Sequence, residues 1–345
     1  MGNRVTMQTI ADQLGISPAA VSKALKGQKG VSASLRQKVL DLAQSEGYQQ
    51  TVHAGRRDDS FTRIRVFVPA RFLDQEQSFY WMLYQELSRA ARPRHGNLYL
   101  EVVEPDMEQS CLLPPMGAPG RTDGAIIMGA FHPAYKRMLS GKLNLPYLFL
   151  DTEWPDGEGD SLISDNLEGG MEMTSYLLRH GHRRIGYFGT LLQTESIDDR
   201  YFGYYKALMH HGIALDPALV VNDRAPDGIS FRPEDVAFPD NLPTAFFCNC
   251  DASADLLIRA LGLRGLRVPD DVSVAGFDNY APLPGIMTQV TTWEVSLPGM
   301  AQQAISLLYQ KLQDPAFHAG RSILPGRLIE RDSVRTVGDP VPLLI

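Results

Sequence analysis

Three charged residues stand where the chain could bind a hydroxyl-rich molecule. Asp151 and Asp278 end the apolar runs "PYLFLD" and "VSVAGFD", and Arg200 follows a polar loop at the predicted start of a helix. Carboxylates accept hydrogen bonds from hydroxyl groups, and a guanidinium donates two bonds in a fixed fork, so the three together suit a neutral polyol. Singly, each is more often a turn or surface residue, and the set has meaning only if the fold brings it together.

Signatures of catalysis are absent from the sequence. The chain contains no G-x-S-x-G, P-loop or H-E-x-x-H motif. Cys248 and Cys250 have no nearby His or Cys partner for zinc, and with Cys111 they are expected to be core thiols in a reducing cytoplasm. No apolar run is long enough to cross a bilayer. We therefore expect a cytoplasmic protein that is not an enzyme and has no cofactor, no metal and no membrane partner.

Strands and helices that could position the charged residues alternate from residue 63 onward. This alternation predicts an α/β body in which helices cover both faces of parallel sheets. There are too many strands for one sheet, so we expect two doubly wound lobes with a ligand between them, at the carboxyl ends of the strands. The predicted strands are 64–70, 97–104, 124–130, 146–151, 183–189, 244–250 and 272–278, and the predicted helices are 79–92, 167–180, 199–211, 252–263 and 297–313.

The amino-terminal segment differs from the body in charge. Residues 1–57 hold eight Lys or Arg and three Asp or Glu, a net charge of +5, within a chain whose total is −7. A basic head on an acidic body indicates that the head meets a polyanion and the body does not.

Three short helices are predicted in this basic head. Thr6 can cap a first helix that Gly15 ends, Ser17 can cap a second with Pro18 in its first position, and Ser32 opens a third. Two short helices joined by a glycine turn, followed by a third, form a helix-turn-helix. A helical bundle with no nucleic-acid role has the same pattern, but the positive charge favours DNA binding.

Residues 5–48 resemble the headpiece of the lactose-repressor/galactose-repressor (LacI/GalR) family. The similarity lies in T-x-x-x-I-A, the G-I-S turn, V-S-K-A-L, the V-S before the third helix and the closing G-Y. It implies that the second helix enters the major groove of operator DNA, and that Pro18, Ala19 and Lys23 face base edges. The predicted phosphate contacts are Ser17, Ser22, Lys26, Lys29 and Ser32, and Thr6 completes the headpiece set.

The segment after Tyr48 departs from that family. Gln50 stands where the family usually has proline, and Arg57 stands where a leucine enters the minor groove, although Ala54 matches the small residue at which two hinge helices touch. Two readings remain open. Arg56 and Arg57 could enter a narrow minor groove, or the segment could be a flexible linker with two solvated arginines.

The body resembles the effector-binding part of the same family, which is similar to periplasmic sugar-binding proteins. The matching stretches include "SDNLEGG", "DRYFGYYKAL", "GLRVPDDVSVAGFDN" and "GRLIERDSV". The resemblance implies three crossings between lobes, near 155–161, 285–293 and 320–326. The family's helix between the second and third strands is expected to be short or missing, because this stretch is rich in Pro and Gly. The expected domains are a headpiece 1–48, a hinge 49–62 and a body 63–340, with an N-lobe of about 63–158 and 292–320 and a C-lobe of about 159–291 and 321–340.

The same resemblance adds three residues to the effector set. Asp151, Arg200 and Asp278 match positions that contact effector in the family. Phe79 opens the first body helix, where the family places an aromatic residue against the ligand, and Phe247 matches a position that stacks on ligand in purine-binding relatives. Asn249 lies one place before the position at which many sugar-responsive members have Asn. The set is therefore Phe79, Asp151, Arg200, Phe247, Asn249 and Asp278, whereas Tyr80 and Trp293 are expected to serve packing.

Together these observations predict an effector-responsive transcription regulator, a repressor that binds a palindromic operator as a homodimer. Its expected effector is a small polar metabolite, a sugar, bound between the lobes and coupled to DNA affinity. Thr194, where a purine-binding relative has Arg, argues against a purine. The alternatives are a nucleoside or sugar phosphate effector, or an α/β ligand-binding protein with an unrelated helical appendage. No heptad leucine pattern follows residue 335, which favours a dimer over a zipper-tethered tetramer.

Overall fold

The computed structural model describes residues 7–25, 31–45, 61–73, 78–114, 122–154, 159–226, 228–280, 289–314 and 316–343. The chain divides into two units, Met1–Asp59 and Ser60–Ile345. Of the predicted hinge, only Phe61 and Thr62 lie within the described residues.

The first unit contains the three predicted helices, α1 (Met7–Leu14), α2 (Pro18–Leu25) and α3 (Ala33–Ser45). Ser17 Oγ accepts a hydrogen bond from the Ala20 N–H and Ser32 Oγ from the Leu35 N–H, each at 3.2 Å. Gly15 between α1 and α2 has φ 62°, a left-handed conformation that suits glycine. The predicted caps at Ser17 and Ser32 and the predicted glycine turn are thus confirmed. The small core consists of Ile10, Ala11, Val21, Ala24, Val39 and Ala43.

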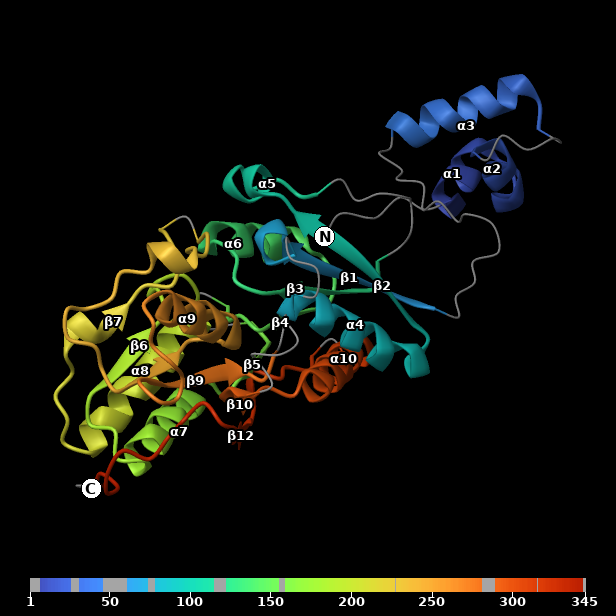
Figure 1. Cartoon of the computed structure of the whole chain (residues 1–345). Coiled ribbons are helices and arrows are strands. Elements are labelled where there is room, and N and C mark those ends of the chain that lie inside the picture. Colours follow the sequence, from blue (N-terminus) through green and yellow to red (C-terminus); the bar gives the residue numbers. More distant parts are fainter. Residues whose placement is uncertain are drawn as a thin grey trace. The chain divides into compact units, whose positions relative to one another are not determined.

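The first lobe of the second unit is a six-stranded parallel sheet in the order β11-β5-β4-β3-β1-β2. Its helices α4 (Phe79–Ala91) and α10 (Leu297–Gln313) pack against each other on one face, and α6 (Pro133–Lys142) covers the other (Figure 1). The strands are β1 (Thr62–Pro69), β2 (Gly96–Val103), β3 (Gly124–Met128), β4 (Tyr147–Leu150), β5 (Ser161–Ser164) and β11 (Arg321–Leu324). Short helices are η1 (Ala70–Phe72), η2 (Arg92–Arg94) and α5 (Pro105–Gln109).

The second lobe has a sheet in the order β12-β10-β9-β8-β6-β7, parallel except for the antiparallel pair β10–β12. Helices α7 (Asn166–Arg179) and α8 (Glu195–His210) lie on one face and α9 (Asp251–Leu263) on the other (Figure 1). The strands are β6 (Ile185–Phe188), β7 (Val220–Val221), β8 (Ala245–Cys248), β9 (Ser273–Asp278), β10 (Thr291–Glu294) and β12 (Arg327–Ile329), and the short helices are η3 (Pro217–Leu219) and η4 (Pro233–Asp235). The predicted α/β class with two doubly wound lobes is confirmed.

Three chain crossings join the lobes, but two lie later than predicted. The chain leaves the first sheet after Ser164, returns after Glu294 and leaves again after Leu324. Residues 161–164 and 321–324 therefore belong to the first lobe and 292–294 to the second, contrary to the predicted lobe boundaries. The short strands "SLIS", "TTWE" and "RSIL" mix polar with apolar residues, so hydrophobic pattern alone did not reveal them.

Two local differences from the predicted elements bear on the site. Helix α8 begins at Glu195 rather than at 199, because Thr194 Oγ1 accepts a hydrogen bond from the Ile197 N–H and caps the helix four residues earlier. Arg200 therefore lies in the second turn and not at the helix start. Helix α5, between β2 and β3, has only five residues, which confirms the short helix expected there.

No helix among the described residues is long and apolar enough to span a membrane. The described residues also hold no group of three or more His, Cys, Asp or Glu side chains arranged as metal ligands.

Candidate functional site

A cavity of about 460 Å³ lies between the two lobes, bordered by residues at the carboxyl ends of β4 and β9. We call it the strand-end cavity. The first lobe contributes η1, the start of α4 and Asp151, and the second contributes α8, the loop after β8 and Asp278. Its volume is within the range of about 300–1,000 Å³ that is usual for small-molecule sites.

Arg200 bonds to three neighbouring residues at the edge of this cavity. Its Nε donates to Asn166 Oδ1 at 2.9 Å and its Nη1 to the main-chain oxygen of Asn249 at 2.6 Å, while Nη2 lies 3.0 Å from Asp278 Oδ1 as an ion pair. The guanidinium carbon lies 3.8 Å from the centre of the Phe277 ring, within the cation–π range. Burial lowers the pKa of Arg200, but the charges of Asp278 and Asp151 outweigh that effect and raise it.

Close helix packing sets the depth of Arg200. A Cβ on Gly203 of α8 would lie 2.2 Å from the main-chain oxygen of Leu167, and one on Gly170 of α7 would lie 2.3 Å from that of Arg200. Both positions therefore require glycine, and α7 and α8 can approach until Arg200 reaches Asn166 at the start of α7.

Asp151 faces the cavity from the first lobe and follows β4 with φ 55°. Tyr80 Oη donates to Asp151 Oδ2 at 2.7 Å. Burial raises the pKa of Asp151 to about 6, although the Tyr80 hydrogen bond and the charge of Arg200 lower it. Tyr80 also stacks on Phe72, with ring centres 4.6 Å apart. The sequence predicted that Tyr80 would only pack against its neighbours. In the structure Tyr80 lines the cavity, and its hydroxyl group orients the carboxylate of Asp151.

Asn249 borders the cavity but its amide nitrogen turns into the second lobe. Its Nδ2 donates to Phe188 O at 3.1 Å, Asp223 Oδ2 at 2.8 Å and Ser253 Oγ at 3.1 Å. Asp223 in turn pairs with Arg224 at 2.7 Å. Burial raises the pKa of Asp223, but its hydrogen bonds from Arg224, Ser253 and Asn249 lower it to about 2. Asn249 thus supports the cavity loop, and its main-chain oxygen is the group that reaches Arg200.

The two predicted aromatic residues have different positions. Phe79 lines the cavity, with its ring centre 6.3 Å from that of Tyr280. Phe247, predicted to stack on the ligand, is fully buried in the core and is not among the described residues that line the cavity. Strand β8 is covered by helices on both faces, so its side chains pack in the two hydrophobic cores.

Sequence reasoning missed several lining residues. Four of them come shortly after strands β1, β7 and β9, and the fifth lies in the first turn of α4; they are Arg71, Phe72, Arg224, Tyr280 and Tyr80. Arg71 and Tyr280 lie two residues beyond β1 and β9, so the rule that drew attention to Asp151 could have found them.

In the headpiece, the structure describes part of the predicted DNA-binding set. Ser17, Pro18, Lys23 and Ser32 are exposed, while Val21 and Ala24 of α2 are buried. The side chains of Ala19 and Ser22 lie outside what the structure describes. Thr6, Lys26, Lys29, Ala54, Arg56 and Arg57 lie outside the described residues.

Known proteins resemble the chain over both units. Residues 174–334 match the periplasmic binding protein-like domain family. The HTH-type transcriptional repressor PurR of Pasteurella multocida is 27% identical over 342 residues, covering 96% of this chain and 99% of that protein. The HTH-type transcriptional repressor CytR of Escherichia coli is 27% identical over 342 residues, covering 96% of this chain and 97% of that protein.

Two solved structures share the fold. The transcriptional regulator CelR in complex with cellobiose has a TM-score of 0.67 at 21% identity, and the lac repressor dimer bound to operator and the anti-inducer ONPF has 0.61 at 21% identity. Each comparison covers 96% of this chain and 100% of the other. The relatives matched along nearly their whole length are transcriptional repressors and not enzymes, in agreement with the prediction. The resemblance to the LacI/GalR family that the sequence indicated is thus confirmed: along nearly its whole length the chain is similar to transcriptional repressors and shares the fold of LacI-type regulators.

Proposed function

We propose that this protein is a transcriptional repressor that binds a near-palindromic operator as a homodimer. We further propose that a neutral sugar, held in the strand-end cavity, regulates its affinity for the operator. The headpiece, with Lys23 as its base-reading side chain, supplies the specific contacts. The operator and homodimer parts are supported by the similarity to the lac repressor, which is solved as a dimer on operator.

The observation that carries the effector class is the pairing of every described cation in the cavity wall. Arg71 faces Glu108, Arg200 faces Asp278 and Arg224 faces Asp223. A phosphate or carboxylate ligand would have to compete with a protein carboxylate for each guanidinium. Hydroxyl groups instead can donate to Asp151 and Asp278 while retaining these pairs.

Aromatic side chains support the same class. Phe72, Phe79 and Tyr280 give the cavity apolar faces beside its carboxylates, and a flat apolar face next to polar groups suits the two sides of a sugar ring. The same rings could stack on a base, so a nucleoside is the second candidate.

A thermal-shift panel tests the effector class, because a ligand of the native state raises the melting temperature by mass action. The panel contains neutral sugars, their phosphates, hexuronates and nucleosides at matched concentrations. We expect a neutral sugar to raise the melting temperature and its phosphate to have little effect. A shift with the phosphate alone would contradict the proposal, and a shift with nucleosides alone would select the second candidate.

Gel shifts on the protein's own promoter region test the DNA part. Lys23→Ala should lose about 1–3 kcal/mol of binding to the operator and little on random DNA, because a base contact carries sequence preference. Lys38→Ala in the exposed part of α3 serves as the matched control for removal of one charge. Equal losses on operator and random DNA for Lys23→Ala would show that Lys23 only contacts phosphate.

A further inference from the structure

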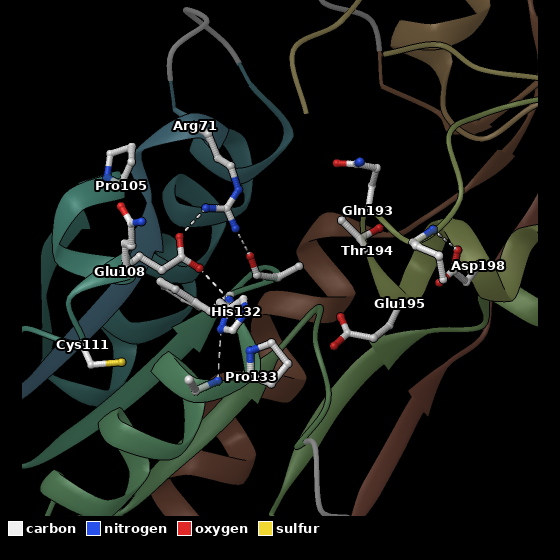
Figure 2. Close-up of a pocket in the computed structure, with 15 residues that line it drawn as sticks. Arg71, Pro105, Glu108, Cys111, His132, Pro133, Gln193, Thr194, Glu195 and Asp198 are labelled. Carbon is white, nitrogen blue, oxygen red and sulfur yellow. Dashed lines mark hydrogen bonds and ion pairs between the residues drawn. The ribbon is translucent and has the colours of Figure 1, made fainter. Parts of the chain in front are cut away.

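A second cavity of about 760 Å³ lies between the lobes beside the first. We call it the α5–α6 cavity, because α5 and the start of α6 form its wall in the first lobe. The loop that leads into α8 forms the opposite wall in the second lobe. Figure 2 shows Glu108 and His132 facing Gln193, Thr194 and Glu195 across the open space.

The two cavities are neighbours in one interlobe cleft. Arg71 of the first lobe and Thr194 of the second line both of them. Arg71 is held in place at this junction, since its Nη1 donates to Glu108 Oε2 and its Nη2 to the main-chain oxygen of Ala130, each at 2.5 Å. A ligand that filled the strand-end cavity could therefore continue past Arg71 and Thr194 into the α5–α6 cavity.

An ion pair between a buried lysine and a half-exposed glutamate joins the two lobes at the α5–α6 cavity. Lys136 of α6 is fully buried, and its Nζ donates to Glu195 Oε1 of α8 at 2.6 Å and to Thr152 Oγ1 at 3.0 Å. Because Lys136 belongs to the first lobe and Glu195 to the second, this pair holds the walls at a defined separation. The α5–α6 cavity therefore lies beside a direct contact between the two lobes.

The charges of this cavity match those of its neighbour. Its described carboxylates are Glu108, Glu195 and Asp198, whereas Arg71 is its one described guanidinium and is paired with Glu108. His132 Nδ1 accepts from the Ala134 N–H at 3.3 Å, so in the neutral ring the proton is on Nε2, which can donate to a ligand. An anionic group is disfavoured here too, and hydroxyl groups have both donors and acceptors to meet.

We propose that the α5–α6 cavity is a second subsite, and that the effector is an extended neutral glycoside with one sugar unit in each cavity. This inference rests on the proposed function, in which a neutral sugar occupies the strand-end cavity. The second unit bridges the lobes through the α8 loop and the start of α6. A monosaccharide would fill only the first subsite.

Isothermal titration calorimetry with matched sugars tests the subsite. The probes are glucose against cellobiose and maltose, and galactose against lactose and melibiose, on the full chain. We expect one disaccharide to bind at least about tenfold more tightly than its monosaccharide, the equivalent of about 1.4 kcal/mol. Ala134→Trp, at an exposed position in the first turn of α6, should abolish this advantage and leave monosaccharide affinity within about twofold.

Two further variants control that result. Gln193→Trp fills the cavity from the opposite lobe and should act like Ala134→Trp, so that misfolding of one variant does not decide the outcome. Lys142→Trp adds the same ring at an exposed position near the end of α6, away from the cavity lining, and should leave both affinities unchanged. Melting temperatures of all three variants report whether they fold.

The outcomes separate this inference from the proposed function. If a monosaccharide binds as tightly as its disaccharides, or if both cavity-filling variants leave disaccharide affinity unchanged, the second subsite is wrong and the sugar effector stands. If none of these sugars binds the wild-type protein, the subsite falls together with the neutral-sugar assignment.

Discussion

The two walls of the strand-end cavity satisfy their polar groups in different ways. In the second lobe, Arg200, Asn249 and Asp223 are bonded to one another or to neighbouring main chain, and the pKa of Asp223 is lowered to about 2. In the first lobe, Asp151 accepts a hydrogen bond from Tyr80, and burial raises its pKa to about 6. The second lobe thus presents a surface whose polar side chains are already bonded to one another, whereas the first lobe presents a carboxylate with a pKa near 6, whose ionisation can respond to a ligand.

Under the proposed function, this difference would give the two walls different parts in regulation. A preorganised wall binds without reordering its side chains, which keeps the entropic cost of binding low. A carboxylate with a pKa near 6 shifts toward its charged form when ligand hydroxyls donate to it, because hydrogen bonds to the charged form favour that form. Binding energy released on the first-lobe wall can then favour the lobe arrangement that brings Asp151 to the ligand.

The largest expected effect comes from removing the Arg200 guanidinium from the second-lobe wall. Arg200→Met would leave Asp278 buried without its counter-ion and would also free Asn166 and the Asn249 main chain. Removing one partner of a buried ion pair costs about 3–5 kcal/mol, so we expect a loss of that size in the free energy of unfolding by urea. Effector binding should be lost as well.

The double variant Arg200→Met with Asp278→Asn is the control for this prediction. It removes the unpaired charge together with its partner and should recover part of the stability. A loss below about 1 kcal/mol for Arg200→Met alone would show that the second-lobe wall is not held by this pair.

Local signals in the sequence were sufficient for much of the fold. Gly15, the capping residues Ser17 and Ser32, and the apolar face of α10 gave element bounds that the structure confirms. These features depend on neighbours within a few residues, so a short stretch of sequence is enough to predict them. The short strands β5 and β11 carry no such pattern, because the edge of a larger sheet stabilises them.

The site was only partly predictable from the sequence, because part of it depends on contacts between distant parts of the chain. The strand-end position of Asp151 and Asp278 follows from local sequence, and the structure brings both to one cavity with Arg200. Whether a side chain points into a cavity or into the core depends on helices that cover the strand from elsewhere in the chain. That non-local packing buries Phe247 and turns the amide of Asn249 inward, and no spacing along the sequence reports it.

A change of pH should have an intermediate effect on effector affinity. This effect should come from Asp151 of the first lobe and not from Asp223 of the second. The ionised form of Asp151 accepts from ligand hydroxyls, so protonation opposes binding. With a pKa of about 6, affinity should be nearly constant above pH 7 and fall about tenfold between pH 7 and pH 5. Asp223, whose pKa is about 2, is ionised throughout that range and adds no pH dependence.

Calorimetric titrations of Asp151→Asn over the same pH range provide the check. The variant should bind more weakly at pH 7 and show a flatter pH profile, with the remaining slope assigned to Asp278, whose pKa burial also raises. A profile as steep as that of the wild type would place the responsive group elsewhere in the cavity.

The smallest expected effect compares two arginines of the cavity, one from each wall. Arg71 of the first lobe has a side chain that is 41% exposed, whereas that of Arg200 is 7% exposed. In Arg71→Met, Glu108 still accepts a hydrogen bond from the His132 N–H at 2.6 Å, so its carboxylate keeps a partner. A pair with one exposed member contributes about 0–1 kcal/mol, and we expect the free energy of unfolding by urea to fall by no more than that. A loss for Arg71→Met as large as that for Arg200→Met would mean that the first-lobe wall is clamped as firmly as the second, and the difference in regulatory part that we draw between the walls would not hold.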